Sequence, residues 1–392
     1  KYHKTLEEYK KRIESYNYSV IQVSDVPIDV ATVIFTRINV GGKPLSLFEI
    51  MVAKTYDYDK DFDLSERFNH LLESLKNVDY ETISDASVLQ LVSLILTKEC
   101  KRKIILKLDK EQFIKNWDST IDAIERAVDY FRGFYRIPVS QLLPYNALIV
   151  PFAYFFYYHK DKPTGDKQKY LQDFFWRVSL AGRYSSSVES KLAQDIKRID
   201  KILNNELPKY DWPVNTSSEF IKNNGWFSAG RSYVKAVLCI YAYYQPKSFV
   251  DDSLVNINND WLKQANSKNY HHFFPRAYLR KLNKDEQKIN HILNITIVDD
   301  FLNKREIKDK PPSKYMEKFK KDNPRHLSET MKTHLITNLE EFGVLSDNYD
   351  LFIDKRAEEV SKEIEKRIIK QKIDETPQAD LINDVSEEFE IE

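Results

Sequence analysis

The sequence predicts an α+β protein that is predominantly α-helical, and three observations support this. Apolar residues recur three and four positions apart through most of residues 65–244, the spacing of a helix that buries one face. Only 8 glycines occur among 392 residues, so the chain has few of the flexible turns that many-stranded folds need. Short β-branched stretches such as residues 292–298 indicate a small amount of strand near the C-terminus.

The N-terminal elements follow in order. Residues 2–16 predict a charged helix, residues 19–23 a short strand, and residues 31–39 an apolar helix or strand that ends at Gly41-Gly42. The next helix is expected to begin after Ser46, because Ser46 can cap its first turn and Glu49 completes a capping box.

The middle of the chain predicts a helical domain. Helical spacing is clearest in residues 87–96, 113–131 and 170–180, and prolines and glycines interrupt it at Pro138, Pro144, 163–165, Pro208, Pro213 and Gly225. The aromatic runs 154–158 and 174–176 could stack on nucleic-acid bases, but aromatic residues at helical spacing more often form a core.

The polar stretch 246–261 indicates a domain boundary. Beyond it we expect a strand-like piece at Phe273-Phe274, a short helix, a strand at 292–298, a helix from Asp299 to the Pro311-Pro312 break, and a charged helix over 354–372. Val360, Ile364 and Ile368 share one side of that last helix. The predicted units are residues 1–60, a helical domain 61–250, a third domain 251–345, and a C-terminal helix with acidic tail 346–392.

The composition excludes several classes. No phosphate-cradling glycine motif is present, and Cys100 and Cys239 lack the close partners of a zinc site or a disulfide framework. The longest apolar stretch, residues 147–158, is too short to span a bilayer. We therefore expect a soluble cytoplasmic protein with no membrane partner.

Charge is unevenly distributed although the formal net charge is zero. Residues 262–332 contain 17 Lys and Arg against 9 Asp and Glu, whereas residues 373–392 contain eight acidic residues and no basic one. The basic segment suits a polyanion such as nucleic acid, although charge runs are often only solvated faces.

The residues with the most specific chemistry lie in the third domain. His271 and His272 are adjacent on an extended segment, so their side chains point to opposite sides unless the backbone bends. Asn294 lies in the second strand-like piece, and Asn303 follows nine residues later on the expected helix.

Strand, strand and helix carrying these residues resemble the HNH motif of the ββα-metal nucleases. The resemblance implies that His272 is the general base on the attacking water, that Asn294 orients it, and that His271 and Asn303 hold a metal ion. Histidine titrates near neutral pH, which suits a base acting on water. Few carboxylates are available, so one Mg²⁺ or Mn²⁺ ion is expected as cofactor. Arg276, Lys304 and Arg305 are the candidates for DNA phosphate contacts.

A second resemblance covers most of the chain. The segment Arg37-Ile-Asn39-Val-Gly41-Gly42 is similar to the Arg-Ile-Asn-x-Gly-Gly segment of the GmrSD-type restriction endonucleases, in which a ParB-like nucleotidase domain precedes a helical region and an HNH domain. The resemblance implies a defence enzyme acting on foreign or modified DNA. The family's Asp-Gly-Gln-Gln-Arg motif is absent, so Arg37, Asn39, Gly41 and Gly42 would be the remnant of a nucleotide site. A nucleoside triphosphate is then expected only in the complete protein.

Other interpretations stay open. The histidines could be an interfacial pair, the asparagines turn or cap residues, and Gly41-Gly42 a tight turn; Asp299 and Asp300 are alternative ligands in place of Asn303. The chain as a whole could be a nucleic-acid-binding scaffold with an inactive site, or a helical protein-interaction subunit of a defence complex. Homo-oligomerisation is equally open.

Overall fold

The computed structural model describes residues 2–17, the single residues 20, 22, 24, 26, 30 and 34, and then 45–228, 230–258, 270–298, 307 and 309–381. Its α-helices of six or more residues are α1 (Tyr2–Glu14), α3 (Leu47–Thr55), α4 (Leu64–Lys76), α5 (Asp85–Thr97), α7 (Lys110–Gly133), α8 (Ile149–Tyr158), α9 (Gly165–Leu180), α10 (Val188–Leu203), α11 (Ser218–Asn224), α12 (Ser232–Tyr243), α14 (Arg276–Lys281), α16 (Pro312–Asp322), α17 (Leu327–Lys332) and α18 (Tyr349–Glu365). Short turns α6 (Arg102–Ile105) and α15 (Glu286–Ile289) and a few 3-10 turns join them. The prediction of a predominantly helical protein is confirmed.

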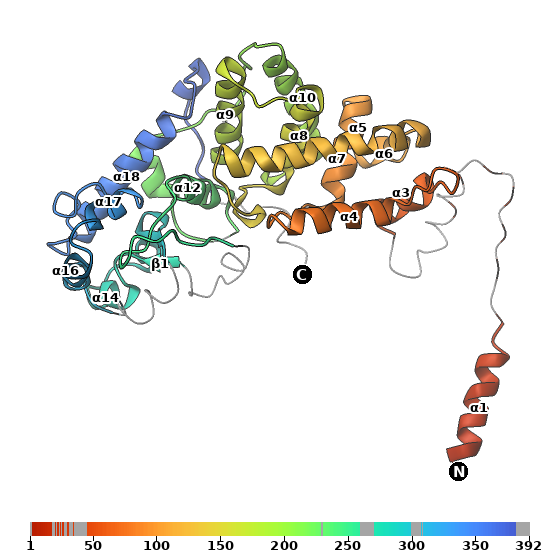
Figure 1. Ribbon diagram of the computed structural model, residues 1–392, viewed down its shortest axis with the longest axis horizontal. Coiled ribbons are helices and arrows are strands. Elements are labelled where there is room, and N and C mark those ends of the chain that lie inside the picture. Colours follow the sequence, from red (N-terminus) through yellow and green to blue (C-terminus); the bar gives the residue numbers. More distant parts are fainter. Residues whose placement is uncertain are drawn as a thin grey trace.

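The helices from α3 to α12 enclose one large hydrophobic core, and α7 and α8 lie side by side within it (Figure 1). α7 contributes Phe113, Trp117, Ile124, Val128 and Phe131, which recur at helical spacing and are all buried. The periodic segments 87–96, 113–131 and 170–180 lie in α5, α7 and α9, as expected.

The capping box expected at Ser46 is present. The Ser46 hydroxyl accepts a hydrogen bond from the Glu49 amide at 3.1 Å, and the Glu49 carboxylate accepts one from the Ser46 amide at 2.7 Å. Two of the amides that a helix start leaves without intrahelical partners are thereby satisfied.

The aromatic runs of the middle region are core residues, except that Tyr157 is half-buried and Tyr158 is 50% exposed. Tyr154, Phe155 and Phe156 on α8, and Phe174, Phe175 and Trp176 on α9, are almost completely buried. Rings from these helices pack against α7, with the Phe131 and Phe152 centroids 4.8 Å apart. The core interpretation is therefore confirmed, and stacking of these rings on bases is not available in this fold.

A small antiparallel hairpin follows the helical region. β1 (Tyr270–His272) pairs with β2 (Ile295–Ile297) in the register Tyr270 with Ile297, His271 with Thr296, and His272 with Ile295. Ile295 and Ile297 belong to the first core, whereas Phe273 and Phe274 belong to a second core with α14, α16 and α17. The hairpin thus lies where the two cores adjoin.

Two expected boundaries in this region were wrong. β1 ends at His272, so Phe273-Phe274 follows the strand in a bend, and residues 292–294 form a 3-10 turn before β2. Pro311-Pro312 starts α16, with Pro312 in its first turn, because proline lacks only an amide that a helix start leaves unpaired. The helix expected from Asp299 lies outside the described residues.

α18 connects the two cores. Its Phe352 packs against Phe273 in the second core, with ring centroids 4.9 Å apart, while Val360 and Ile364 are buried in the first. The helix begins at Tyr349 because Asn348 caps it, and it ends at Glu365, so the expected bounds of 354–372 were shifted. Ile368 lies beyond the end of the helix, so it does not share the helix side expected for it, but it packs on the first core.

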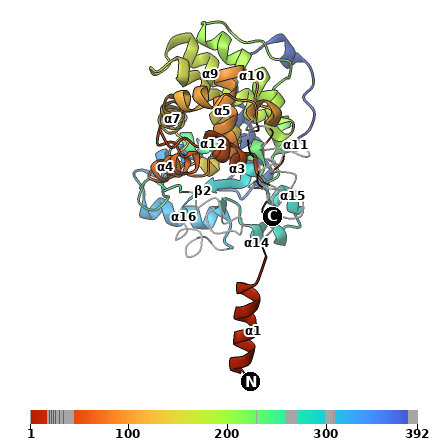
Figure 2. The ribbon, with the colours of Figure 1, turned by 90° about the vertical axis from the view of Figure 1, so that its right-hand side faces the viewer.

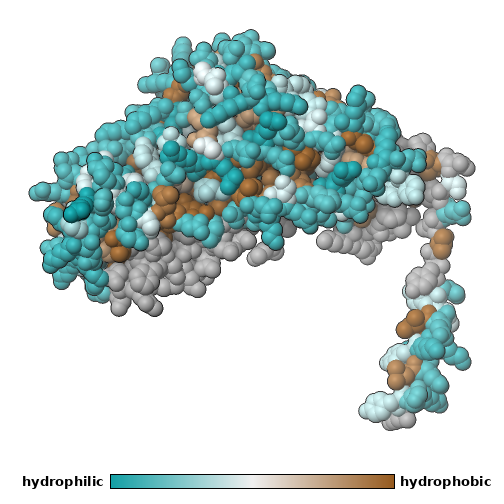
Figure 3. Space-filling view, viewed as in Figure 1, coloured by the Kyte–Doolittle hydropathy of each residue, from teal (hydrophilic) through white to brown (hydrophobic). Residues whose placement is uncertain are grey.

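α1 stands apart from the remaining helices in both Figure 1 and Figure 2, and none of its residues is buried. Tyr2, Leu6, Tyr9 and Ile13 follow one another at spacings of four, three and four residues and are 58% to 90% exposed. Apolar side chains of this helix are visible on its surface in Figure 3. Most of the strand and Gly-Gly segment expected between residues 18 and 44 lies outside the described residues.

Neither a disulfide nor a membrane span appears in the described part of the chain. Cys100 and Cys239 are buried thiols, and none of the described helices is long and apolar enough to cross a bilayer.

Candidate functional site

The two adjacent histidines face opposite sides of the hairpin. His271 lies opposite Thr296 in the register, and its ring approaches that of Tyr315 on α16, with centroids 6.4 Å apart. His272 lies opposite Ile295 and contacts Asn290. This alternation is what an extended segment imposes, so the two imidazoles occupy different environments.

The imidazole of His272 is oriented by Asn290. The Asn290 side-chain amide donates a hydrogen bond from Nδ2 to the Phe227 carbonyl at 3.0 Å, which leaves Oδ1 facing His272 Nε2 at 3.0 Å. Because an amide oxygen only accepts, Nε2 of the neutral imidazole must carry the proton. The lone pair of His272 is therefore on Nδ1.

Burial keeps His272 neutral. Loss of hydration lowers the pKa of His272 to about 4, and Arg276 and Arg280 lower it further, while the Asn290 bond acts in the opposite direction. The imidazole is thus unprotonated at pH 7 and can accept a proton. The expectation that His272 titrates near neutral pH was wrong, because the sequence does not reveal how far its ring is withdrawn from water.

Asn294 bonds the backbone of the bend and not the His272 ring. It is fully buried, and its side chain accepts a hydrogen bond from the Phe274 amide at 2.8 Å and donates to the carbonyls of Phe274 at 3.0 Å and Ile289 at 3.1 Å. These bonds fasten the bend after β1 to the end of α15. Asn290, four residues earlier, makes the contact with His272 that the sequence assigned to Asn294.

The backbone that carries the histidines is held from both sides. The Phe273 amide donates to the Asn294 carbonyl at 2.7 Å, and the Tyr315 hydroxyl donates to the Phe273 carbonyl at 2.5 Å. With the bonds from Asn294, both amides and both carbonyls of Phe273-Phe274 are satisfied, and Pro275 has no amide to satisfy. The bend is rigid, and the preceding His272 is positioned with it.

α14 presents basic residues beside this bend. Arg276 and Arg280 share the Glu286 carboxylate, at 3.5 and 2.5 Å. Lys281 pairs with Asp309 at 3.1 Å and Lys284 with Asp350 at 2.7 Å. Part of the charge that the sequence suggested for phosphate contacts is therefore compensated within the fold, and Arg276 remains exposed next to His272's side of the hairpin.

Several candidate residues lie outside the described part of the chain: Asn303, Lys304, Arg305, the alternatives Asp299 and Asp300, and the nucleotide-site candidates Arg37, Asn39, Gly41 and Gly42. Among the described residues, no group of three or more His, Cys, Asp and Glu side chains could hold a metal ion. Of the two expected metal donors, the structure describes only His271. Its imidazole is buried, with 1% of the residue exposed.

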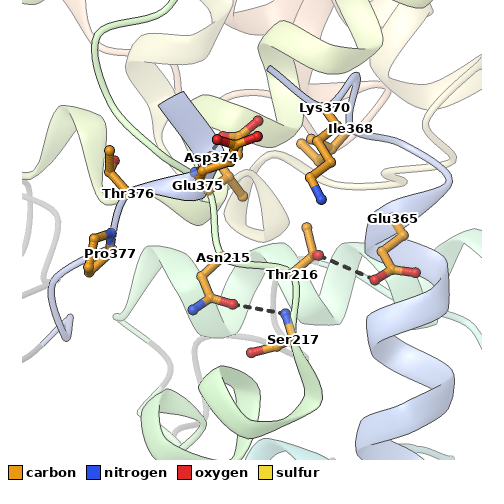
Figure 4. A pocket seen from close by; sticks show the side chains of 11 residues that line it. Asn215, Thr216, Ser217, Glu365, Ile368, Lys370, Asp374, Glu375, Thr376 and Pro377 are labelled. Atoms are coloured by element: carbon orange, nitrogen blue, oxygen red, sulfur yellow. Dashed lines mark hydrogen bonds between the residues drawn. The ribbon is translucent and has the colours of Figure 1, made fainter. Parts of the chain in front are cut away.

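One cavity lies elsewhere in the described part of the molecule. It has a volume of about 710 Å³ and lies between residues 214–217 and the segment 365–377 that follows α18 (Figure 4). Its carboxylate Asp374 is already paired with Arg177 at 2.6 Å. None of the candidate residues that the structure describes lines this cavity.

Sequence comparisons give one informative relative. An uncharacterized protein of the archaeon Methanocaldococcus jannaschii is 26% identical over 384 residues, which cover 90% of this chain and 63% of the relative. The chain therefore spans less than two thirds of that relative's length. No protein-family profile matches the chain.

Proposed function

We propose that this chain is a metal-dependent HNH endonuclease that cleaves DNA by phosphodiester hydrolysis. The observation that carries the proposal is the hydrogen bond from His272 to Asn290, which fixes a neutral imidazole at the end of β1 with its lone pair on Nδ1. A positioned, unprotonated imidazole can take the proton of an attacking water.

The proposal assigns the divalent ion to His271 and Asn303. His271 supplies an imidazole nitrogen on the face opposite His272, and Asn303 would supply an amide oxygen, a combination that suits Mn²⁺ or Mg²⁺ with water completing the shell. When bound, the ion would stabilise charge that develops on the phosphate oxygens. In this proposal His272, oriented by Asn290, takes the proton of the water, and Arg276 is the candidate for a contact with a phosphate of the DNA backbone.

The biological setting follows from the resemblance to GmrSD-type enzymes. We propose a restriction or defence function against foreign or modified DNA, with nucleotide control exercised by parts of the complete protein. The Arg37-to-Gly42 segment supports this part of the proposal through its sequence alone.

A plasmid-nicking assay with Mg²⁺ or Mn²⁺ tests the activity. We expect the wild type to nick plasmid, His272→Ala to lose at least about a hundredfold in rate, as expected for removal of a general base, and His70→Ala to be unchanged. His70 is a suitable control because it is an exposed histidine on α4.

The outcomes separate the alternatives. Cleavage that persists in His272→Ala contradicts the assignment of the base. DNA binding without any cleavage by the wild type favours the nucleic-acid-binding scaffold, and failure to bind DNA at low salt favours the protein-interaction subunit.

A further inference from the structure

Another cavity lies where the end of α7 meets the segment that follows α12. It has a volume of about 390 Å³. Arg132 in the last turn of α7 and Arg136 just beyond that helix line one part of its wall. Pro138 and residues between positions 242 and 257 line the rest. Segments far apart in the sequence therefore enclose one space.

The guanidinium of Arg136 is held in a fixed position at this cavity. Its Nη1 donates to the Tyr243 carbonyl at 3.1 Å and to Gln245 Oε1 at 3.2 Å. Its central carbon lies 5.0 Å from the centre of the Tyr243 ring. Because one nitrogen makes both bonds, Nε and Nη2 of the planar group keep their donors for a ligand.

The backbone at Arg136 has a conformation that favours glycine. Its φ is +53°, in the left-handed region where a Cβ is unfavourable. The Ile137 amide closes the turn by donating to the Phe131 carbonyl at 3.0 Å. Glycine would adopt this turn at a lower cost in free energy, so an arginine here indicates a use for its side chain.

Neither arginine of the cavity is neutralised. Among the residues that the structure describes, no ion pair joins Arg132 or Arg136 to a carboxylate, and no acidic residue lines the cavity. Asp252, on the segment after α12, is bonded to Lys247 at 2.7 Å. Asp129, one turn before Arg132, lines a different cavity. The cavity wall therefore has two positive charges and no negative one.

The charges behind Tyr243 compensate one another. A second guanidinium, that of Arg367, lies 4.9 Å from the centre of the Tyr243 ring. Arg367 donates to the Glu363 carboxylate at 2.6 Å, and Lys366 donates to the same carboxylate at 2.5 Å. Glu363 is thus bonded to two cations and is not a partner for Arg136.

Apolar side chains form much of the remaining wall. They are Pro138, Ala242, Pro246, Leu254, Val255 and Ile257. Leu254 is 62% exposed, so an apolar group that entered the cavity would remove part of this side chain from water. Such burial is favourable. The cavity therefore combines a cationic part with an apolar part.

We propose that this cavity binds a small organic anion. A carboxylate or phosphate group of the ligand is held by Arg132 and Arg136, and its apolar group packs against Leu254 and the neighbouring prolines. Guanidinium groups bind both kinds of oxyanion through paired, charge-assisted hydrogen bonds. The inference is independent of the proposed nuclease function, because no residue of the hairpin lines this cavity.

Binding is measured by calorimetric titration of the full chain at low salt. The probes are 4-phenylbutyrate and phenyl phosphate, which place a carboxylate or a phosphate on an aromatic group. We expect at least one probe to bind with a Kd below about 1 mM. Tighter binding of 4-phenylbutyrate assigns the cavity to carboxylates, and tighter binding of phenyl phosphate assigns it to phosphate esters.

Three variants test the two parts of the wall. Arg132→Gln and Arg136→Gln should each weaken the binding of the better probe by at least about fivefold, because each removes a charged donor. Leu254→Ser should weaken it by about two- to fivefold through lost apolar contact. All three side chains are exposed, so the variants should fold. Arg102→Gln, at an exposed position on α6 outside this cavity, is the control and should leave the affinity unchanged.

Three results would overturn the proposal. The first is that neither probe binds at about 10 mM. The second is that Arg102→Gln weakens binding as much as Arg132→Gln and Arg136→Gln, since the probes would then respond only to net charge. The third is that inorganic phosphate binds as tightly as phenyl phosphate and Leu254→Ser has no effect on either probe, since the apolar wall would then contribute nothing.

Discussion

At the scale of single residues, the environment of His272 is set by one amide. Asn290 cannot rotate without giving up its bond to the Phe227 carbonyl, so its oxygen stays directed at Nε2. A carboxylate in the same place would instead favour the imidazolium ion, since an opposite charge within hydrogen-bond distance stabilises the protonated ring.

We therefore predict that Asn290→Asp raises the pKa of His272 from about 4 by at least about one unit. NMR titration of the ring protons, assigned with His272→Gln, gives the measurement. Cleavage at pH 5 should fall as well, because a much larger share of the base is protonated there than in the wild type. An unchanged pKa would mean that Asn290 does not contact the ring in solution.

Asn294 should respond differently, because its bonds hold the backbone. Replacement by alanine leaves the Phe274 amide and two carbonyls buried without these partners, which costs about 2–4 kcal/mol of the free energy of unfolding. We predict a larger loss in urea denaturation for Asn294→Ala than for His272→Ala, because alanine at 272 removes one buried hydrogen bond and alanine at 294 removes three. Equal stability losses in the two variants would contradict this division between a positioning residue and a catalytic one.

At the scale of elements, the approach of α11 to the end of α15 depends on Gly225. A Cβ at this position would lie on the His291 imidazole and 2.7 Å from the Ile221 carbonyl. A backbone carbonyl cannot move aside cheaply, and His291 is itself held by the Lys222 carbonyl at 3.0 Å and the Leu293 amide at 3.1 Å. The bridge between Trp226 and His291 therefore requires glycine.

We predict that Gly225→Ala lowers the free energy of unfolding by about 1–3 kcal/mol, the usual cost of overpacking. Gly133→Ala at the end of α7 is the matched control, because nothing lies within 4 Å of its added Cβ. That control should be neutral or slightly stabilising, since alanine favours the helical conformation. Chemical denaturation of both variants measures the difference, and a neutral Gly225→Ala would show that α11 and α15 are not held together as described.

Elements differ in how well their sequence predicts them. The apolar residues of α5, α7 and α9 are strongly periodic over long helices, so local sequence predicts these helices. The capping box at Ser46 depends on two residues three positions apart, so local sequence predicts it as well. The Asn290 contact depends on Phe227, 63 residues away, and on the depth at which the hairpin is buried. Local sequence patterns reveal neither this long-range contact nor the depth of burial. The sequence therefore singled out Asn294 and not Asn290, and it did not predict the low pKa of His272.

At the scale of the whole molecule, buried histidines couple stability to pH. Burial lowers the pKa of His291 and of His334 to about 4. His291 is 7% exposed and His334 is 2% exposed. His334 contacts the Lys247 carbonyl at 2.8 Å and the Phe249 ring in the second core, while His291 joins α15 to α11. Protonation of either ring therefore opposes contacts between distant parts of the chain.

The direction in which pH changes the stability follows from the pKa of each histidine in the folded and in the unfolded chain. In the unfolded chain a histidine titrates near 6.5, so between pH 6.5 and 4 the unfolded state binds more protons than the folded one. The stabilisation is complete above pH 6.5 and is lost as the pH falls towards 4. Asp173 acts in the opposite direction, because burial raises its pKa to about 6, so a single variant is needed to isolate one histidine.

We predict that His334→Gln flattens the pH dependence. Glutamine can still donate to the Lys247 carbonyl but does not titrate, so the loss of unfolding free energy between pH 7 and pH 5 should be about 2 kcal/mol smaller than in the wild type. Urea denaturation at the two pH values gives this difference directly, and His70→Gln, an exposed ring on α4, serves as control. An identical pH dependence in His334→Gln and the wild type would mean that His334 is protonated in the folded protein and that the second core admits water around it.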